Sequence, residues 1–244
     1  SWDARVASGT SSIRQYINAS NTLTTPSGTN IAITTQPAWF LYVRGDRTVS
    51  GPGVSGNTTL RVSGNLNTGN QDVSVPASNF TLIGNPYVSP IDFSLARANA
   101  ATTHTLNKFW VWDPKVGTNG AYVLLDGGLG YVPSVATGSY PSATSIIQSG
   151  QAFFVQSDGT AGNFRMQEDD KASTYQGVYK TTNGTDPLLF VRLNMEDPTT
   201  SGTFTTADGI IAAFNNAYAA GVDNEDGIKL WNFGPNLSLL RNGS

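Results

Sequence analysis

The chain has 244 residues, of which only 13% are charged, and its formal net charge is −3. A globular protein has about 25% charged residues, so this chain depends on hydroxyl and amide groups for its solubility. The small negative charge provides no basic surface for nucleic acid, and no apolar run reaches the roughly 20 residues of a membrane-spanning helix. We therefore expect neither nucleic acid nor membrane insertion.

The sequence contains no cysteine and 26 glycines. Without disulfides, packing, hydrogen bonds or bound ions must stabilise the fold. The chain opens with Ser1–Arg5 (SWDAR), which has neither an initiator Met nor the pattern of a signal peptide. We expect a processed or excised piece of a longer protein.

The first 36 residues are weakly patterned, and Ile13–Ile17 fits a helical turn as well as a strand. Beyond them, short apolar or alternating runs bounded by turn residues predict a succession of strands. In chain order these are Ala38–Arg44, Thr58–Val62, Asp72–Val75, Phe80–Ile83, Leu106–Asp113, Tyr122–Leu125, the aromatic strand that follows a turn at Ser149-Gly150 within Ile146–Val155, Asn163–Met166, Pro187–Asn194, Ile228–Phe233 and Leu237–Leu240. Gly209–Gly221 is ambiguous, because its apolar spacing and alanines favour a helix whereas its asparagines and glycines oppose a long one.

The stretch Phe80–Phe93 (FTLIGNPYVSPIDF) is expected to organise the larger part of the chain. Its strand breaks at Gly84-Asn85-Pro86, where the glycine can take a positive φ and the proline fixes its own φ. Residues 91–98 are compatible with a short helical segment. A rigid corner of this kind is a structural device and carries no chemistry.

Strands and turn signals recur at the spacing found in β-sandwiches. We predict an all-β fold of two β-sandwich-like units of antiparallel strands. The densest charge in the chain, Gln167–Lys171 (QEDDK), marks a shift in composition. We place the larger unit at residues 1–170 and the smaller unit at residues 171–244.

Several of these stretches, in this order, resemble large surface proteins of gliding, type IX-secreting bacteria. They are Phe40–Arg47 (FLYVRGDR), Thr58–Asn67 (TTLRVSGNLN), Leu82–Tyr87 (LIGNPY), Trp110–Asp113 (WVWD), Gly150–Val155 (GQAFFV), Asp223–Phe233 (DNEDGIKLWNF) and Asn236–Leu239 (NLSL). In those proteins a similar β-rich segment lies upstream of the C-terminal sorting domain. The resemblance implies an exported protein, at the outer cell surface or extracellular, which is modular and often an adhesin.

The sequence contains no recognisable catalytic motif. A glycosidase needs two carboxyl groups across a cleft, and no spacing singles out a pair among Asp92, Asp113, Asp126 and Glu168. His104 is the only histidine and is expected in an exposed loop; with no cysteine, a multi-histidine or cysteine zinc site is excluded. We predict that the chain is not an enzyme.

The interpretation that we favour is a non-catalytic structural or adhesive module of a large exported bacterial cell-surface protein, whose partners are other modules of that protein or assembly. The first alternative is a carbohydrate-binding module or glycan-active accessory domain, in which Trp110 and Trp112 would bind glycans. A filament or shell subunit is the third. Arg44-Gly45-Asp46 spells a cell-attachment tripeptide, although a structural turn is the favoured interpretation.

An acidic turn predicts a cation site. Asp223, Glu225 and Asp226 place three carboxylates within four residues, and Asp208 is a further candidate ligand. Oxygen ligands in a turn that ends with glycine suit the hard ion Ca²⁺, and the lack of nearby His and Cys disfavours zinc.

Calcium is therefore expected to raise the melting temperature, because only the folded turn presents the ligands together. Thermal unfolding in millimolar calcium and in EDTA measures the effect. Identical curves would mean that the turn is a solvated loop.

Overall fold

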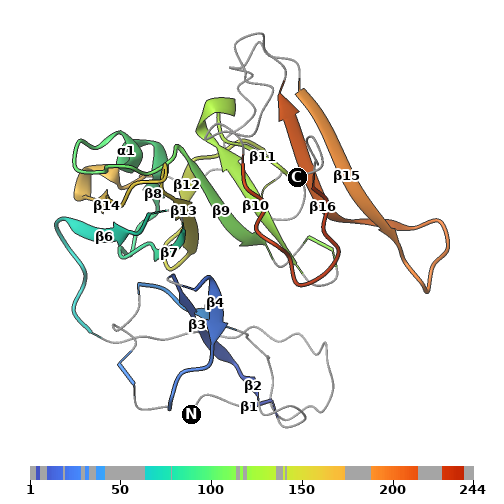
Figure 1. The fold of residues 1–244 in the computed structure, drawn as a ribbon, viewed down its shortest axis with the longest axis horizontal. Coiled ribbons are helices and arrows are strands. Elements are labelled where there is room, and N and C mark those ends of the chain that lie inside the picture. The colour runs from blue at the N-terminus through green and yellow to red at the C-terminus, as the bar shows by residue number, and fades with distance from the viewer. Residues whose placement is uncertain are drawn as a thin grey trace.

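The computed structural model describes residues 4–5, 10–18, 20–28, 31–32, 37–41, 64–77, 79–113, 116–117, 120–135, 140, 142–173, 188–213 and 227–238. This part of the chain is mostly β, with several small sheets and one short α-helix (Figure 1). Every strand pairing within it is antiparallel. The prediction of an antiparallel all-β fold is confirmed at this level. No helix among the described residues has the length and apolar character to cross a membrane.

A five-stranded sheet lies at the centre of the fold. Its strands, in spatial order, are β11 (Val132–Pro133), β10 (Ala121–Asp126), β9 (Lys108–Asp113), β13 (Ala152–Gln156) and β7 (Phe80–Gly84). Successive side chains of a strand point to opposite faces. In β9, Phe109 and Val111 enter one apolar cluster while Trp110 enters another. The sheet is therefore buried on both faces, as the bulk at consecutive positions predicts.

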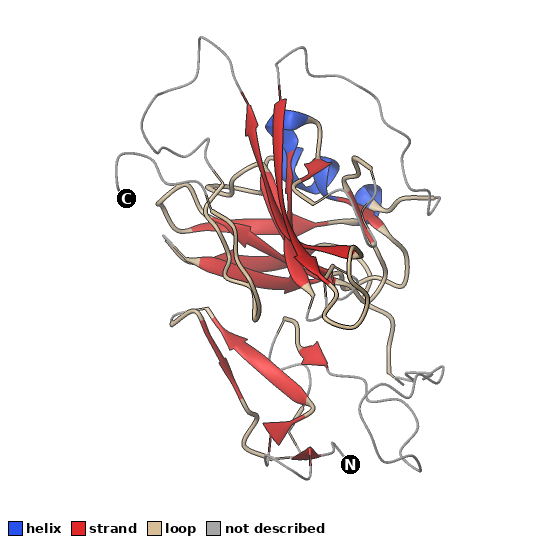
Figure 2. Cartoon of the chain, turned by 90° about the vertical axis from the view of Figure 1, so that its right-hand side faces the viewer, coloured by secondary structure: helices blue, strands red, loops and turns tan. Residues whose placement is uncertain are grey.

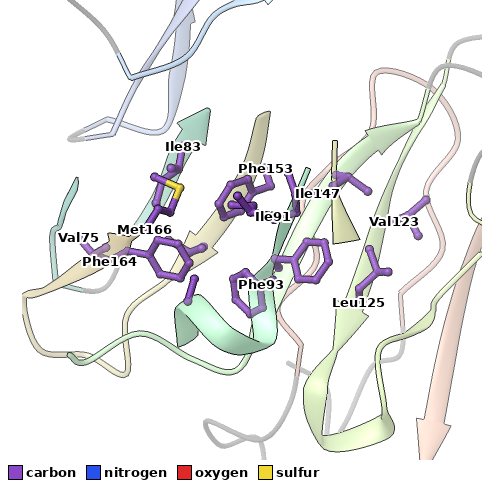
Figure 3. Packing of buried hydrophobic residues seen from close by; sticks show 14 of the residues in the cluster. Val75, Ile83, Ile91, Phe93, Val123, Leu125, Ile147, Phe153, Phe164 and Met166 are labelled. Carbon is purple, nitrogen blue, oxygen red and sulfur yellow. The ribbon is translucent and has the colours of Figure 1, made fainter. Parts of the chain in front are cut away.

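The first face is covered by three small elements. They are the pair β6 (Gln71–Val75) and β14 (Gly162–Met166), the pair β8 (Ile91–Asp92) and β12 (Ile146–Ile147), and the helix α1 (Phe93–Ala98). Phe93 lies at the centre of this cluster, with ring centroids 4.6 Å from Phe109 and 5.5 Å from Phe164 (Figure 3). Each large side chain buried here contributes roughly 1.5–3 kcal/mol.

The second face is covered by the N-terminal sheet, whose order is β4 (Thr22–Thr24), β3 (Ile13–Ile17) and β5 (Phe40–Leu41). Tyr16 of β3 meets Phe154 of β13 edge to face, at 4.8 Å between ring centroids. Phe80 and Trp110 make a second edge-to-face pair at 5.0 Å. Burial raises the pKa of Tyr16 to about 12.

The described chain also contains two hairpins outside these layers. β1 (Ala4–Arg5) pairs with β2 (Thr10–Ser11), and β15 (Leu188–Glu196) pairs with β16 (Phe204–Ala213). The second hairpin is long, and Figures 1 and 2 show it standing beside the central sheet, with β15 on its outer side.

Most strands predicted within the described residues are confirmed, and so is the short helix, which becomes α1. The predicted strand at Ile228–Phe233 is wrong, because these residues run without strand pairing. The ambiguous segment Gly209–Gly221 begins as the end of strand β16. The predicted strand Thr58–Val62 and the tripeptide Arg44-Gly45-Asp46 lie outside the described residues.

The corner at Gly84-Asn85-Pro86 is held by one buried amide side chain. The Nδ2 group of Asn85 donates to the carbonyl oxygens of Ser89 at 2.9 Å and Gln148 at 3.0 Å. Its Oδ1 atom accepts from the backbone N–H of Tyr87 at 3.0 Å. A buried amide with both ends satisfied fixes the path of the chain.

Tyr87 extends this corner toward the β6–β14 pair. Its hydroxyl donates to the carbonyl oxygens of Gly69 at 2.6 Å and Met166 at 3.0 Å. The ammonium group of Lys171 lies over the Tyr87 ring, 4.6 Å from its centroid. Burial, with a smaller effect of nearby acids, raises the pKa of Tyr87 to about 12.

Gly84 is required for a different reason than the sequence suggested. Its φ lies outside the left-handed region, so the expectation of a positive φ is wrong. A Cβ atom built on Gly84 would lie 2.7 Å from the carbonyl oxygen of Pro37. The glycine therefore allows the chain before β5 to approach the end of β7.

Replacing Gly84 with Val is expected to lower the free energy of unfolding by about 1–3 kcal/mol, because the backbone at Pro37 must move. Gly28→Val is the matched control, since a Cβ atom there meets nothing within 4 Å and its φ is not left-handed. Chemical denaturation of both variants measures the difference. Equal stabilities would show that the close approach at Gly84 has no energetic importance.

Candidate functional site

Three of the four residues predicted to bind calcium, Asp223, Glu225 and Asp226, lie outside the described residues. The fourth, Asp208, is fully buried in β16. It lies beside a β-bulge, because Leu193 pairs with Asp208 while Asn194 pairs with Thr206, which leaves Ala207 as an additional residue. A bulge changes the direction of neighbouring side chains, and Asp208 is buried beside this one.

The carboxylate of Asp208 is engaged by groups of the protein itself. The ammonium group of Lys229 lies 2.6 Å from Oδ1 and 2.5 Å from Oδ2. The backbone N–H of Leu237 donates to Oδ2 at 2.6 Å, and that of Gly209 donates to Oδ1 at 2.9 Å. An ammonium group at this distance supplies the positive charge that a calcium ion would supply. The calcium prediction now depends on the acidic turn 223–226.

We call the Asp208–Lys229 ion pair together with the Leu237 N–H the carboxylate clamp. It fastens residues 227–238 to β16, although Asp208 and Leu237 are far apart in sequence. A second contact fastens the same segment to the central sheet, since the backbone N–H of Tyr122 donates to Oδ1 of Asn232 at 2.6 Å. The cation that Asp208 binds in the structure is therefore the ammonium group of Lys229.

The two tryptophans predicted to bind glycans belong to the apolar cluster on the second face of the central sheet. Trp110 is only 2% exposed and packs against Phe80. Trp112 is partly buried, with ring centroids 4.8 Å from Tyr122 and 5.3 Å from Phe233. Their positions give no support to stacking on a sugar ring, and that role stays a prediction.

Other aromatic rings do face solvent. Trp231 is 69% exposed and Phe233 is 65% exposed, whereas Asn232 between them is buried. The two exposed rings flank the buried Asn232, and the ring of Phe233 also contacts that of Trp112. The alternation of Leu230–Phe233 contained this signal, but a strand was inferred from it in place of an exposed aromatic pair.

The carboxylates considered for catalysis hold parts of the fold in place. Asp92 caps the first turn of α1 through the backbone N–H of the second helical residue. Asp126 lies 3.3 Å from the buried ammonium group of Lys108. Glu168 forms an ion pair with Lys171 and accepts a hydrogen bond from the backbone N–H of Gly69 at 2.8 Å. These bonds stabilise turns and strand ends.

Two further acids are buried. Asp113, at the end of β9, is inaccessible to solvent. Asp170 is also buried, and this burial raises its pKa, although the backbone N–H of Gln167 donates to it at 2.8 Å. At the surface, the guanidinium group of Arg165 binds Asp72 through two bonds of 2.9 and 2.6 Å, and these lower the pKa of Asp72. The pair joins β14 to β6.

His104 is exposed, as predicted, and its Nδ1 atom lies 3.1 Å from Oδ2 of Asp158. Within the described ranges, no three side chains of His, Cys, Asp or Glu gather closely enough to hold a metal ion. Comparison with protein-family models, curated protein sequences and solved structures found nothing that matches this chain.

Replacing Lys229 with Met is expected to lower the free energy of unfolding by about 3 kcal/mol or more, because the buried Asp208 carboxylate loses its cation. Lys171→Met is the matched control. Its ion pair with Glu168 is more exposed, and exposed pairs are worth roughly 0–1 kcal/mol.

Urea denaturation of both variants and of Lys229→Met combined with Asp208→Leu provides the test. Apolar replacement of both partners is expected to recover part of the loss. If Lys229→Met is no more destabilising than Lys171→Met, the carboxylate clamp does not hold residues 227–238.

Proposed function

We propose that this chain is a non-catalytic structural or adhesive module of a large exported protein of the bacterial cell surface. The observation that supports this proposal best is the role of the acidic side chains. Asp92, Asp126 and Glu168 each bind a backbone N–H or a cation of the protein itself. Asp208 does the same in the carboxylate clamp. Side chains used in this way make the fold rigid, which is what a structural or adhesive module needs.

The resemblance of the strand and turn motifs to surface proteins of type IX-secreting bacteria supports the same proposal. It implies a module outside the cell or on its outer surface, next to other modules of the same protein. The finer architecture that we propose is a sandwich-like unit over residues 1–170 and a second one over residues 171–244. The apolar layer between the central sheet and the β6–β14 pair supports the larger unit.

A glycan-binding module is the second candidate, and the exposed pair Trp231 and Phe233 favours it. Exposed aromatic rings present apolar faces, and the indole N–H of Trp231 adds a hydrogen-bond donor, which suits recognition of ligands with mixed surfaces. Binding of the purified chain to immobilised polysaccharides that Trp231→Ala abolishes would support this candidate. Retained binding in that variant would count against it.

Antibodies against the purified chain are expected to label intact cells of the organism that produces it, and protease treatment of those cells is expected to remove the label. Immunofluorescence of intact and permeabilised cells provides the measurement, with a cytoplasmic protein as the control. Labelling that requires permeabilisation would contradict the surface location. Polysaccharide hydrolysis by the purified chain that Glu168→Gln or Asp92→Asn abolishes would contradict a non-catalytic role.

A further inference from the structure

The hairpin β15–β16 has one strand edge that pairs with no other strand of the described chain. Among the described residues, β15 pairs with β16 alone, and Figure 1 shows β15 on the side of the hairpin that faces away from the central sheet. The backbone N–H and C=O groups along such an edge can pair with another strand. At nine residues, β15 is longer than any strand of the central sheet.

Several large apolar side chains of β15 are exposed to solvent. Leu189, Phe190, Val191 and Met195 are exposed by 50%, 41%, 37% and 42%. Because consecutive residues point to opposite faces, both faces of β15 are open to solvent. An isolated two-stranded hairpin is marginally stable in water, and more strands are needed to bury an apolar face. The strand therefore has the character of an interface.

We propose that β15 pairs antiparallel with β15 of a second copy of this chain, forming a continuous four-stranded sheet across a two-fold axis. The inference does not depend on the proposed surface function. In a two-fold arrangement the same patch meets itself, so the strand must complement its own sequence in reverse. Charge decides whether it does.

Arg192 and Glu196 are the only charged residues of β15, and their spacing of four places them on one face. If the axis passes through Asn194, Arg192 of each copy lies opposite Glu196 of the other copy, which gives two ion pairs. Centring it on Arg192 would oppose two cations, which is destabilising. The opposite charges therefore select Asn194 as the centre.

The groups needed for these ion pairs are available. Arg192 is exposed and makes no ion pair within the described part of the chain. Glu196 accepts hydrogen bonds from Ser201 and from the backbone N–H of Gly202 through Oε1 alone. Its Oε2 atom can accept from the guanidinium group of the second copy.

The other face of the strand fits the same register. With the axis at Asn194, Leu193 lies opposite Met195 of the second copy. Val191 lies opposite Asp197, just beyond the end of β15, and is diagonal to that Met195. The two copies therefore bring six apolar side chains together on this face, where cross-strand pairs stabilise a sheet. Because only one edge of each hairpin is used, the assembly closes as a dimer and does not extend into a filament.

Sedimentation velocity on the full chain from about 1 μM to about 1 mM is expected to show a reversible monomer–dimer equilibrium, since a single strand edge gives a small interface of modest affinity. Arg192→Glu is expected to weaken association about tenfold or more, because like charges then face each other. Glu196→Arg is expected to do the same. Asp169→Arg is the control, since Asp169 is exposed outside the hairpin and the change in charge equals that of Glu196→Arg.

Mixing the two interface variants is the decisive step. Arg192→Glu carries two acidic residues on the edge and Glu196→Arg carries two basic residues, so each repels its own kind and the mixture is expected to form heterodimers. Where Glu196→Arg disturbs the hairpin through its bonds to Ser201 and Gly202, amide hydrogen exchange replaces the mixing test. Protection of β15 in the natural chain is then expected to rise with concentration, and Arg192→Glu is expected to remove that rise.

Four outcomes would overturn the proposal. They are a monomer at every concentration, a dimer whose affinity Arg192→Glu leaves unchanged, a mixture of variants that stays monomeric while both remain folded, and open-ended oligomers. A monomer would indicate that the edge receives a strand of a different protein or module. Open-ended oligomers would indicate pairing of β15 with β16 of the next copy.

Discussion

Burial of the central sheet on both faces is the constraint on which the rest of this fold depends. A sheet covered on one side needs apolar residues only at alternate positions, whereas β9 and β13 carry bulk at every position, as in Phe109-Trp110-Val111 and Phe153-Phe154-Val155. Each face must then find a covering layer. The β6–β14 pair and α1 cover one face, and the N-terminal sheet covers the other, so distant segments of the chain are tied together through five strands.

This constraint explains what could be predicted. Continuous aromatic runs are visible in the sequence, and they identified β9 and β13 as strands. The corner was also visible as Gly84-Asn85-Pro86. Its mechanism was not, because the contact of Gly84 with Pro37 and the bonds of Asn85 to Ser89 and Gln148 are set by tertiary packing. Periodicity reports which residues are buried and leaves open what they meet.

The same limit applies to the candidate site. A cluster of acidic residues predicts a cation, and Asp208 does bind one, but that cation is the side chain of Lys229. The bulge that leaves Ala207 unpaired and the return of residues 227–238 to β16 create this contact. Neither leaves a signature in local sequence, because both depend on the register of a strand pair. Likewise, Trp110 and Trp112 are residues of the type that binds sugars, but in the structure their rings pack against Phe80 and Tyr122.

The long hairpin β15–β16 differs from the central sheet in the burial of its apolar side chains. β9 places apolar residues on both faces and has both faces buried, whereas the apolar residues on both faces of β15 include side chains that are 37–50% exposed. The two strands are similar in sequence but differ in burial. The described residues therefore leave apolar side chains of β15 partly uncovered. A strand added at the edge pairs the free backbone groups of β15 and places new side chains beside its exposed ones on each face. Opposite charges four residues apart allow an identical strand to be added in reverse. The carboxylate clamp supports such an assembly, since it holds β16 in place against residues 227–238 and so fixes the strand on which β15 rests.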